Sequence, residues 1–459
     1  MDGVARPRPP DHREQAHRGP RRRRPAHDRR RGARSRPRQL DRHVRPHQRH
    51  RAAALARRDR TPAATLPRGA DRGGRVTTVS ETLRVDDLLA TARQRTGLTD
   101  FGDEWFVEPL TVLTTALVDE ARLSALGLEL TRRRLTALLA DRLRLRALQR
   151  AHPSTQEQEV RVAAEICGLP RTGSTLLHRL LAASPRLTST LSWETSYPIP
   201  FPDEGPAATE RKQRAQDRAK LFLEMSPEFA DIHTIEWDGP EEDVILLDRT
   251  FTSMSFDSFY RVPSYGTWLR AADQTRAYRE LREWLQVLQW QDPTRAGRPW
   301  VLKSPHHLTA VDTVLDTFAG CKIVMTHRSP VDAVPSYASM VVSMTKQYSD
   351  EVDPAAVGRY WSARFAATLR DFAAVRRRRP DRFVDVHFAT VLTDPRAQAV
   401  RVLGELGIAA DGADLAAFDA YLARNRAQRH GSHSYTAADF GLSTAQLEQD
   451  FAFYQEGAS

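Results

Sequence analysis

Residues 170–175, Pro-Arg-Thr-Gly-Ser-Thr, combine the residue types that hold a phosphate group. They follow an apolar run over 162–167 and precede apolar residues at helical spacing, which predicts a strand, a tight loop and the first turn of a helix. Free backbone N–H groups and the helix dipole make such a helix start an anion site. The expected phosphate ligands are the side chains of Arg171, Ser174 and Thr175 and the backbone N–H groups of Thr172, Gly173 and Leu176.

The loop is similar to the Walker A loop of nucleoside triphosphatases, but it lacks their Gly-Lys-Ser/Thr ending. No lysine in the loop can therefore reach a γ-phosphate, and no hydroxyl is placed to hold Mg²⁺. We expect a nucleotide without a triphosphate, and no metal.

Two further basic residues stand at the ends of expected strands. Arg328 comes after the apolar run 322–326, and Ser336 follows eight residues later. The planar guanidinium of arginine suits phosphate oxygens, and serine adds a directional hydrogen bond. Lys303 ends the run 300–303 and is one of only five lysines beside 64 arginines. Its compact ammonium suits charge that develops on a leaving-group oxygen.

Together these motifs resemble the sulfotransferases that use 3′-phosphoadenosine-5′-phosphosulfate (PAPS). Their loop has the form Pro-(Lys/Arg)-(Ser/Thr)-Gly-(Ser/Thr)-Thr, which residues 170–175 match at every position. Their 3′-phosphate is bound by an Arg and a Ser eight residues apart, which implies this role for Arg328 and Ser336. The resemblance covers about residues 160–445. It implies an enzyme that moves a sulfuryl group from PAPS to a hydroxyl or, less often, an amine.

The resemblance also implies catalytic residues. Lys303-Ser304-Pro305 is similar to the catalytic lysine element of the tyrosylprotein and related sulfotransferases. Those enzymes carry a catalytic Glu where Glu194 stands here, 23 residues after Arg171. We therefore expect Glu194 as general base, with Lys303 and Arg171 stabilising the departing phosphate. The alternative bases are His233, Glu241 and Glu242, and the roles of His306 and His307 stay open.

The C-terminal region departs from one branch of the family. The Gly-x-x-Gly-x-x-Lys loop of the cytosolic phenol and steroid enzymes is absent, and residues 429–442 look like the ending of bacterial sulfotransferase-family proteins. Arg429 and His433 are the candidates to replace the missing lysine at the nucleotide. The chain is thus expected to be a bacterial family member, closer to the tyrosylprotein type.

Alternating strand and helix patterns predict an α/β fold, with a P-loop-type open, mostly parallel sheet flanked by helices. Ligands then bind beyond the carboxyl ends of the strands, where the motifs above fall. Strands are expected at 161–168, 187–191, 300–303, 322–326 and 383–387, and helices at 175–183, 277–291, 306–318, 331–344, 355–378 and 395–406.

Three regions are expected along the chain. Residues 1–75 form an Arg-rich extension, 76–158 a helical N-terminal region, and 159–459 the sulfotransferase domain. A helical insertion at about 201–295 is expected to cover the site. Its aromatic run at 251–268 would either line the acceptor pocket or form a local core.

The positive charge belongs to the extension. Residues 1–75 hold 24 Arg against seven acidic residues, a net charge of +17, so the remaining chain carries −6 of the total +11. Such a segment cannot bury enough apolar surface to fold, and we expect it to be disordered. It is either translated from upstream of the true start or an arm for anionic surfaces, and a nucleic-acid partner is not expected.

Other features indicate compartment and partners. The chain has no secretory signal and no apolar run long enough for a membrane span, and its two cysteines lie in expected core strands. These features predict a cytoplasmic protein. The partner would be a small-molecule, lipid or glycan hydroxyl acceptor, and the helical region offers a homodimer surface. The alternative functions are a P-loop phosphotransferase of kinase-like type and a non-catalytic nucleotide- or nucleic-acid-binding protein.

Overall fold

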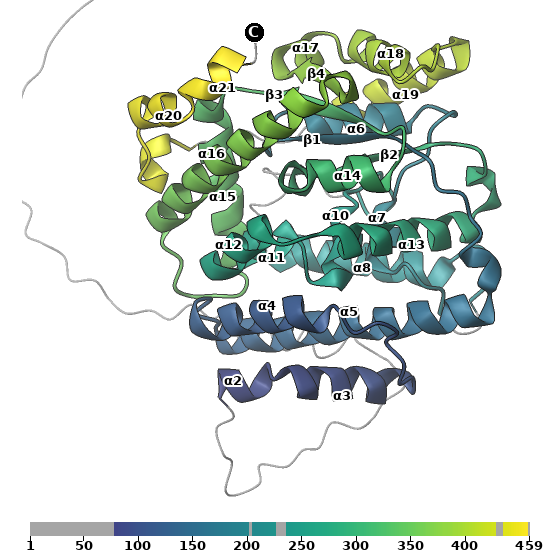
Figure 1. The fold of residues 1–459 in the computed structure, drawn as a ribbon, viewed down its shortest axis with the longest axis vertical. Helices are drawn as coiled ribbons and strands as arrows, with labels where there is room; N and C mark the ends of the chain where they lie inside the picture. Colours follow the sequence, from purple (N-terminus) through teal and green to yellow (C-terminus); the bar gives the residue numbers. More distant parts are fainter. Residues whose placement is uncertain (1–77, 202–203, 226–235, 428–434, 458–459) are drawn as a thin grey trace, which may run out of the picture. The chain divides into compact units, whose positions relative to one another are not determined.

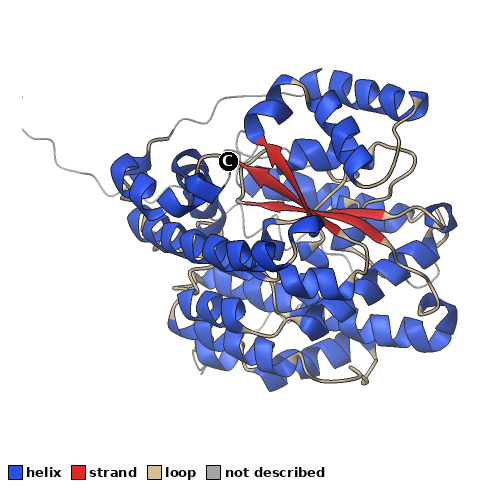
Figure 2. Cartoon of the chain, turned by 45° about the horizontal axis from the view of Figure 1, so that its top comes forward, coloured by secondary structure: helices blue, strands red, loops and turns tan. Residues whose placement is uncertain are grey.

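The computed structural model describes residues 78–201, 204–225, 236–427 and 435–457. A four-stranded sheet lies among helices (Figure 2), with strands β1 (Val162–Gly168), β2 (Trp300–Lys303), β3 (Lys322–His327) and β4 (Phe383–His387). Their order is β2-β1-β3-β4, and all three neighbouring pairs are parallel. The predicted α/β class with a parallel sheet is confirmed.

The register brings the functional strand ends together. Ile166 of β1 lies opposite Lys303, and Gly168 lies opposite Thr326 of β3. The chain passes from β1 to β2 on one side and then crosses to β3 on the other side. In open α/β sheets, ligands bind at the carboxyl ends of strands where the order reverses in this way. The end of β1 is that point.

One group of helices precedes β1 in the sequence, and a second group lies between β1 and β2. The N-terminal helices are α2 (Val79–Thr82), α3 (Val85–Thr96), α4 (Val107–Asp119) and α5 (Ala125–Ala151). Between β1 and β2 lie α6 (Ser174–Ala182), α7 (Ser192–Ser196), α8 (Thr209–Met225), α10 (Val244–Leu247), α11 (Met254–Phe259), α12 (Pro263–Ala271) and α13 (Thr275–Gln291). In Figure 1 the layer of α4 and α5 lies against the layer of α10–α13, which separates it from the sheet.

The remaining helices follow β2. They are α14 (Val311–Thr317), α15 (Pro330–Thr345), α16 (Pro354–Arg378), α17 (Phe388–Thr393), α18 (Pro395–Glu405), α19 (Gly412–Ala427), α20 (Thr444–Asp450) and α21 (Ala452–Gly457). Helix α6 leaves β1 directly through the phosphate loop, and α15 leaves β3 just after Arg328.

The sheet separates two apolar cores because successive strand residues point to opposite faces. Ile166, Val301 and Val324 pack with α6, α18 and α19 on one face. Leu302 and Ile323 pack on the other face with the insertion, α14 and α15. The strands are buried on both faces, which explains their nearly continuous apolar sequences.

Two predicted elements are wrong in detail. The expected strand at 187–191 contributes only one bridge, Thr188 to Trp300, because Leu191 turns away to pair with Pro240 and α7 begins at Ser192. The expected helix at 306–318 is divided into a 3-10 turn (Pro305–Thr309) and α14. Ala310 between them has φ −141°, which no α-helix accommodates.

The aromatic run at 251–268 forms core. Phe251, Phe256 and Tyr265 are inaccessible, and the Tyr265 hydroxyl donates to the carbonyl of Phe251 at 2.9 Å. The local-core alternative therefore describes these side chains, and the acceptor-pocket expectation stays a prediction without support from them.

Several expectations fall on residues outside the described ranges. The extension at 1–75, His233, Arg429 and His433 lie there. Among the described helices, none is long and apolar enough to cross a bilayer. Cys167 in β1 and Cys321, one residue before β3, are buried free thiols.

Candidate active site

The loop between β1 and α6 is held in a tight conformation. Arg171 and Gly173 have left-handed φ angles of 71° and 81°. The Thr172 hydroxyl lies 2.7 Å from the Leu169 carbonyl and 2.6 Å from the Thr326 hydroxyl. These contacts fix the loop to β3. The first backbone N–H groups of α6 have no acceptor within the helix, so they are available to an anion.

The loop contacts both members of the predicted 3′-phosphate pair. The Arg171 Nε donates to the Ser336 Oγ at 3.1 Å. A guanidinium N–H of Arg328 donates to the Arg171 carbonyl at 2.9 Å. The Arg328 guanidinium also stacks 4.5 Å from the ring centre of Phe388. Arg171 thus meets two residues that lie more than 150 positions further along the chain, at the carboxyl ends of β1 and β3.

The charge of this group favours an anion. Burial lowers the pKa of Arg171, and the neighbouring Arg328 lowers it further, while Tyr435 acts in the opposite direction. Arginine side chains stay charged in proteins, so the two guanidinium groups present positive charge beside the loop. A phosphate between them would relieve their mutual repulsion.

Lys303 contacts the other side of the loop. Its Nζ lies 3.2 Å from the Thr175 Oγ1 and also donates to the Glu242 carboxylate. The Ser304 hydroxyl donates to the second oxygen of Glu242 at 3.1 Å. Lys303 is buried, whereas the Glu242 side chain keeps 24% of its surface exposed. A carboxylate and an ammonium thus lie together beside the phosphate loop.

Glu194 is placed elsewhere. Its two oxygens accept from the Arg295 guanidinium at 2.7 and 2.9 Å, and one also accepts from the Leu191 N–H at 3.0 Å. Arg295 stacks on Trp300, at the amino end of β2, whereas Lys303 stands at its carboxyl end. Burial raises the pKa of Glu194 although Arg295 opposes the shift. In the part of the chain that the structure describes, the hydrogen bonds of the Glu194 carboxylate go to Arg295 and Leu191 rather than to the loop.

The site includes residues that sequence reasoning ranked low or missed. Glu242 was only an alternative base, and the signal for it was the acidic run Asp238-Gly-Pro-Glu-Glu-Asp243. Thr326 and Phe388 were missed because their roles arise from packing. A Cβ on Gly173 would lie 3.0 Å from the Phe388 ring, so the ring sets the close approach of this loop.

The two neighbouring histidines after Lys303 are buried. His306 accepts from the Met254 N–H through Nδ1 and contacts Gln274 through Nε2. His307 faces Tyr278 through Nδ1 and Asp243 through Nε2. The pKa of His306 lies well below its usual range because of burial and the neighbouring His307. Both rings are buried in the protein interior, three and four residues after Lys303.

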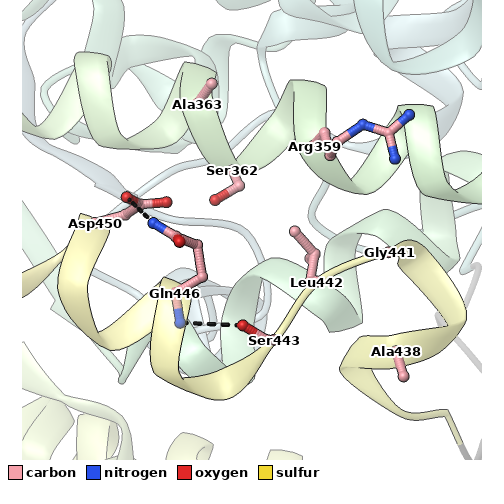
Figure 3. A pocket seen from close by; sticks show the side chains of 9 residues that line it. All are labelled: Arg359, Ser362, Ala363, Ala438, Gly441, Leu442, Ser443, Gln446 and Asp450. Atoms are coloured by element: carbon pink, nitrogen blue, oxygen red, sulfur yellow. Dashed lines mark hydrogen bonds between the residues drawn. The ribbon is translucent and has the colours of Figure 1, made fainter.

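A cavity of about 520 Å³ lies between α16 and the C-terminal segment (Figure 3). Its wall includes Arg359, Ser362 and Gln446, and the Gln446 side chain donates to Asp450 at 2.8 Å. The loop residues, Lys303 and Arg328 do not line it. This cavity is therefore separate from the site described above.

Comparisons with known proteins point to one class. Residues 165–412 match a sequence model described as the sulfotransferase family. The chain is 25% identical over 306 residues to the omega-hydroxy-beta-dihydromenaquinone-9 sulfotransferases Stf3 of Mycobacterium bovis and Mycobacterium tuberculosis. That match covers 61% of this chain and 70% of each relative.

Two solved structures share the fold. Sulfotransferase STF1 from Mycobacterium tuberculosis is 28% identical with a TM-score of 0.67, over 81% of this chain and 98% of that one. Sulfotransferase STF9 from Mycobacterium avium is 24% identical with a TM-score of 0.72, over 84% and 98%. The second likeness bears on the fold alone.

Proposed function

This chain belongs to the sulfotransferase family, and from that premise we propose that it transfers the sulfuryl group of PAPS to a hydroxyl group. One observation carries the proposal for the donor. The loop between β1 and α6 contacts Ser336 through Arg171 and Lys303 through Thr175. Groups suited to two separate phosphates therefore meet on one loop, as a donor with a 5′-phosphosulfate and a 3′-phosphate requires.

Each end of the donor has its own ligands in this proposal. Arg328 and Ser336 bind the 3′-phosphate, which selects PAPS over ATP. The backbone N–H groups from Thr172 to Leu176 bind the 5′-phosphosulfate at the positive end of α6. The side chains of Arg171, Ser174 and Thr175 complete this cradle. No ligand for Mg²⁺ is required, because the loop lacks the Gly-Lys-Ser/Thr ending that serves the metal.

The chemical step is an in-line displacement at sulfur. The acceptor oxygen forms a bond to sulfur while the bond from sulfur to the bridging phosphate oxygen breaks. The electron pair of that bond stays on the departing 5′-phosphate, whose new charge is stabilised by Lys303, Arg171 and the loop N–H groups. The acceptor proton passes to a carboxylate. The products are the sulfated acceptor and adenosine 3′,5′-bisphosphate.

Glu242 fits the role of that carboxylate better than Glu194. It is partly exposed and lies in contact with Lys303, beside the leaving group of the proposed donor. Both oxygens of Glu194 are instead occupied by the Arg295 guanidinium, and its side chain is buried. We therefore propose Glu242 as general base and assign Glu194 to the positioning of α7, whose first turn it caps.

The acceptor is proposed as a small molecule or lipid that carries a hydroxyl group. The relatives named for a hydroxylated dihydromenaquinone support a lipid hydroxyl as the first compound to test. A panel should also contain a phenol and a simple glycoside. We expect ³⁵S to pass from labelled PAPS to the acceptor, and no labelled product to form when the acceptor is left out.

Calorimetry tests the donor site without an acceptor. We expect adenosine 3′,5′-bisphosphate to bind, and ATP–Mg²⁺ to bind much more weakly. Arg328→Ala removes hydrogen bonds to a charged group, about 1.5–3 kcal/mol, and should weaken binding about 10- to 150-fold. Arg396→Ala, at an exposed arginine in the first turn of α18, is the matched control. Tight binding of ATP–Mg²⁺ without binding of the bisphosphate would overturn the donor assignment.

A further inference from the structure

A buried cluster of ionisable groups lies directly behind Lys303. Glu165 stands in the middle of β1, and among the described residues neither of its inaccessible carboxylate oxygens meets a donor with good hydrogen-bond geometry. The Nε2 of His307 lies 3.2 Å from the Glu165 Oε1 and 3.1 Å from the Asp243 Oδ1. The Nδ1 of the same ring lies 2.6 Å from the Tyr278 hydroxyl.

The cluster requires bound protons. Burying two carboxylates side by side in a protein interior is costly unless one is neutralised. Burial raises the pKa of Glu165 well above its usual range, and Asp243 raises it further. Burial also raises the pKa of Tyr278, so its hydroxyl keeps a proton for Nδ1. With Nε2 protonated, the imidazole donates to Asp243 and accepts from Tyr278.

This arrangement joins three segments of the active site. Asp243 is adjacent to Glu242, and His307 follows Lys303 by four residues. The contact between Asp243 and His307 thus connects the segment that carries Glu242 with the segment that carries Lys303. Glu242 and Lys303 themselves form an ion pair. The third segment is β1, where the Ile166 carbonyl next to Glu165 accepts from the Ser304 N–H at 3.1 Å.

We propose that His307 is a positioning residue for sulfuryl transfer, which holds Asp243 against the interior and thereby keeps the Glu242 carboxylate against Lys303. The proposal rests on the proposed function for the roles of Glu242 and Lys303. As a positioning residue, His307 does not touch the reacting atoms. It acts through the backbone between residues 242 and 243 and through the turn that follows Lys303.

The first test follows Lys303 directly and needs no acceptor. Acetylation by an N-hydroxysuccinimide ester, read by mass spectrometry, can be followed at Lys303 and, as an internal reference, at Lys322. In His307→Leu we expect Lys303 to be labelled at least fivefold faster relative to Lys322. His307→Gln places an amide donor near the former Nε2 and should restore slow labelling.

His306→Leu is the matched control, because His306 is equally buried but contacts Gln274 and Met254 instead of Asp243. Its thermal stability should fall as in His307→Leu, with Lys303 labelling unchanged. Equal labelling in the two leucine variants would overturn the proposal. That result would not count against the proposed function, provided that the wild-type protein binds adenosine 3′,5′-bisphosphate.

Measurements of turnover also distinguish a positioning role of His307 from a purely structural one. With an acceptor from the panel, His307→Leu should lower kcat at least tenfold, leave bisphosphate affinity within twofold, and be partly rescued by Gln. Failure of wild-type protein to bind the bisphosphate would instead count against the proposed function.

The ligand atoms of Glu165, Asp243 and His307 lie within 4.8 Å of one another, a spacing that a metal ion would also accept. Elemental analysis of the purified wild-type protein decides this point. A stoichiometric metal in the wild-type protein that is lost in His307→Gln would contradict a cluster whose charges are neutralised by bound protons. Substoichiometric metal in both proteins would support it.

Discussion

At the scale of the residue, the two candidate carboxylates differ in what surrounds them. Glu242 shares its oxygens with Lys303 and Ser304 at the carboxyl ends of the strands, and it remains partly exposed. Glu194 is buried against Arg295, with the Leu191 N–H as a third ligand. A base must exchange its proton with an acceptor and then with solvent. The partial exposure of Glu242 is what supports the proposal of Glu242 as base.

Glutamine substitutions distinguish these two residues. Glu242→Gln should lower kcat about 10²- to 10⁴-fold, the usual contribution of a general base, with little change in bisphosphate affinity. Glu194→Gln should mainly reduce stability, by at most roughly 3–5 kcal/mol, because it removes the buried carboxylate partner of Arg295 and leaves only the partly exposed Asp292, 3.3 Å away. Steady-state kinetics and chemical denaturation measure the two effects. A folded Glu194→Gln protein without turnover, beside an active Glu242→Gln protein, would return the role of base to Glu194.

At the scale of the element, the end of β1 depends on the absence of a side chain. Gly168 has φ 151°, and a Cβ there would lie 2.4 Å from the Thr326 Oγ1 and 2.5 Å from the Thr326 carbonyl oxygen. The backbone of β3 cannot withdraw without breaking the parallel ladder. This close approach also allows the Thr172 and Thr326 hydroxyls to meet at 2.6 Å and to fix the loop.

Gly168→Ala should therefore disturb both stability and donor binding. We expect a loss of at least 2 kcal/mol in the free energy of unfolding, from overlap in a packed core, together with weaker bisphosphate binding. Gly320→Ala is the control, since Gly320 also has a positive φ but open space around it, and strain alone should cost about 1 kcal/mol. Urea denaturation and calorimetry provide the measurements. Equal losses in the two variants would show that contact with Thr326 is unimportant.

The elements of this fold were largely predictable. The runs at 300–303 and 383–387 are confirmed as strands at both ends, because apolar stretches between turn signals are typical of strands buried on two faces. The expected strand at 187–191 has leucines at both ends, yet Leu191 pairs with Pro240, some fifty residues away. That pairing is tertiary, and no local pattern encodes it.

The site could be predicted in part. The pairs Arg171 with Ser336 and Lys303 with Thr175 meet because parallel strands deliver their carboxyl ends to one edge. The place of Glu194 could not be derived in the same way. Its orientation depends on Arg295, which follows the insertion and lies 101 residues further along the chain.

At the scale of the whole molecule, the pH dependence of stability should show the buried cluster. Glu165 has a raised pKa when folded, so the native state holds a proton that the unfolded chain releases above about pH 4.3. The free energy of unfolding therefore falls as pH rises from that value toward the folded pKa, by about 1.4 kcal/mol for each unit of the shift. Burial, Asp243 and Glu242 raise the pKa of Glu165, whereas the Ser304 N–H and Lys303 oppose the shift.

Glu165→Gln removes this titration while keeping the shape of the side chain. Relative to wild-type protein, the variant should gain stability as pH increases above about 5, until the pH reaches the folded pKa of Glu165. Denaturant midpoints across that range, with His306→Leu as a variant that leaves Glu165 in place, measure the difference. A constant offset between Glu165→Gln and wild type would mean that Glu165 is already ionised when folded.

The left-handed backbone at Arg171 and Gly173 has a kinetic consequence. Because the hydroxyl pair with Thr326 and the contact with Ser336 hold the loop in this shape, its conformational entropy is lost during folding rather than on encounter with a ligand. A nucleotide then meets a rigid receptor instead of shaping one. Its association should follow a single phase whose rate rises linearly with concentration, set by diffusion and by the charge of the two arginines.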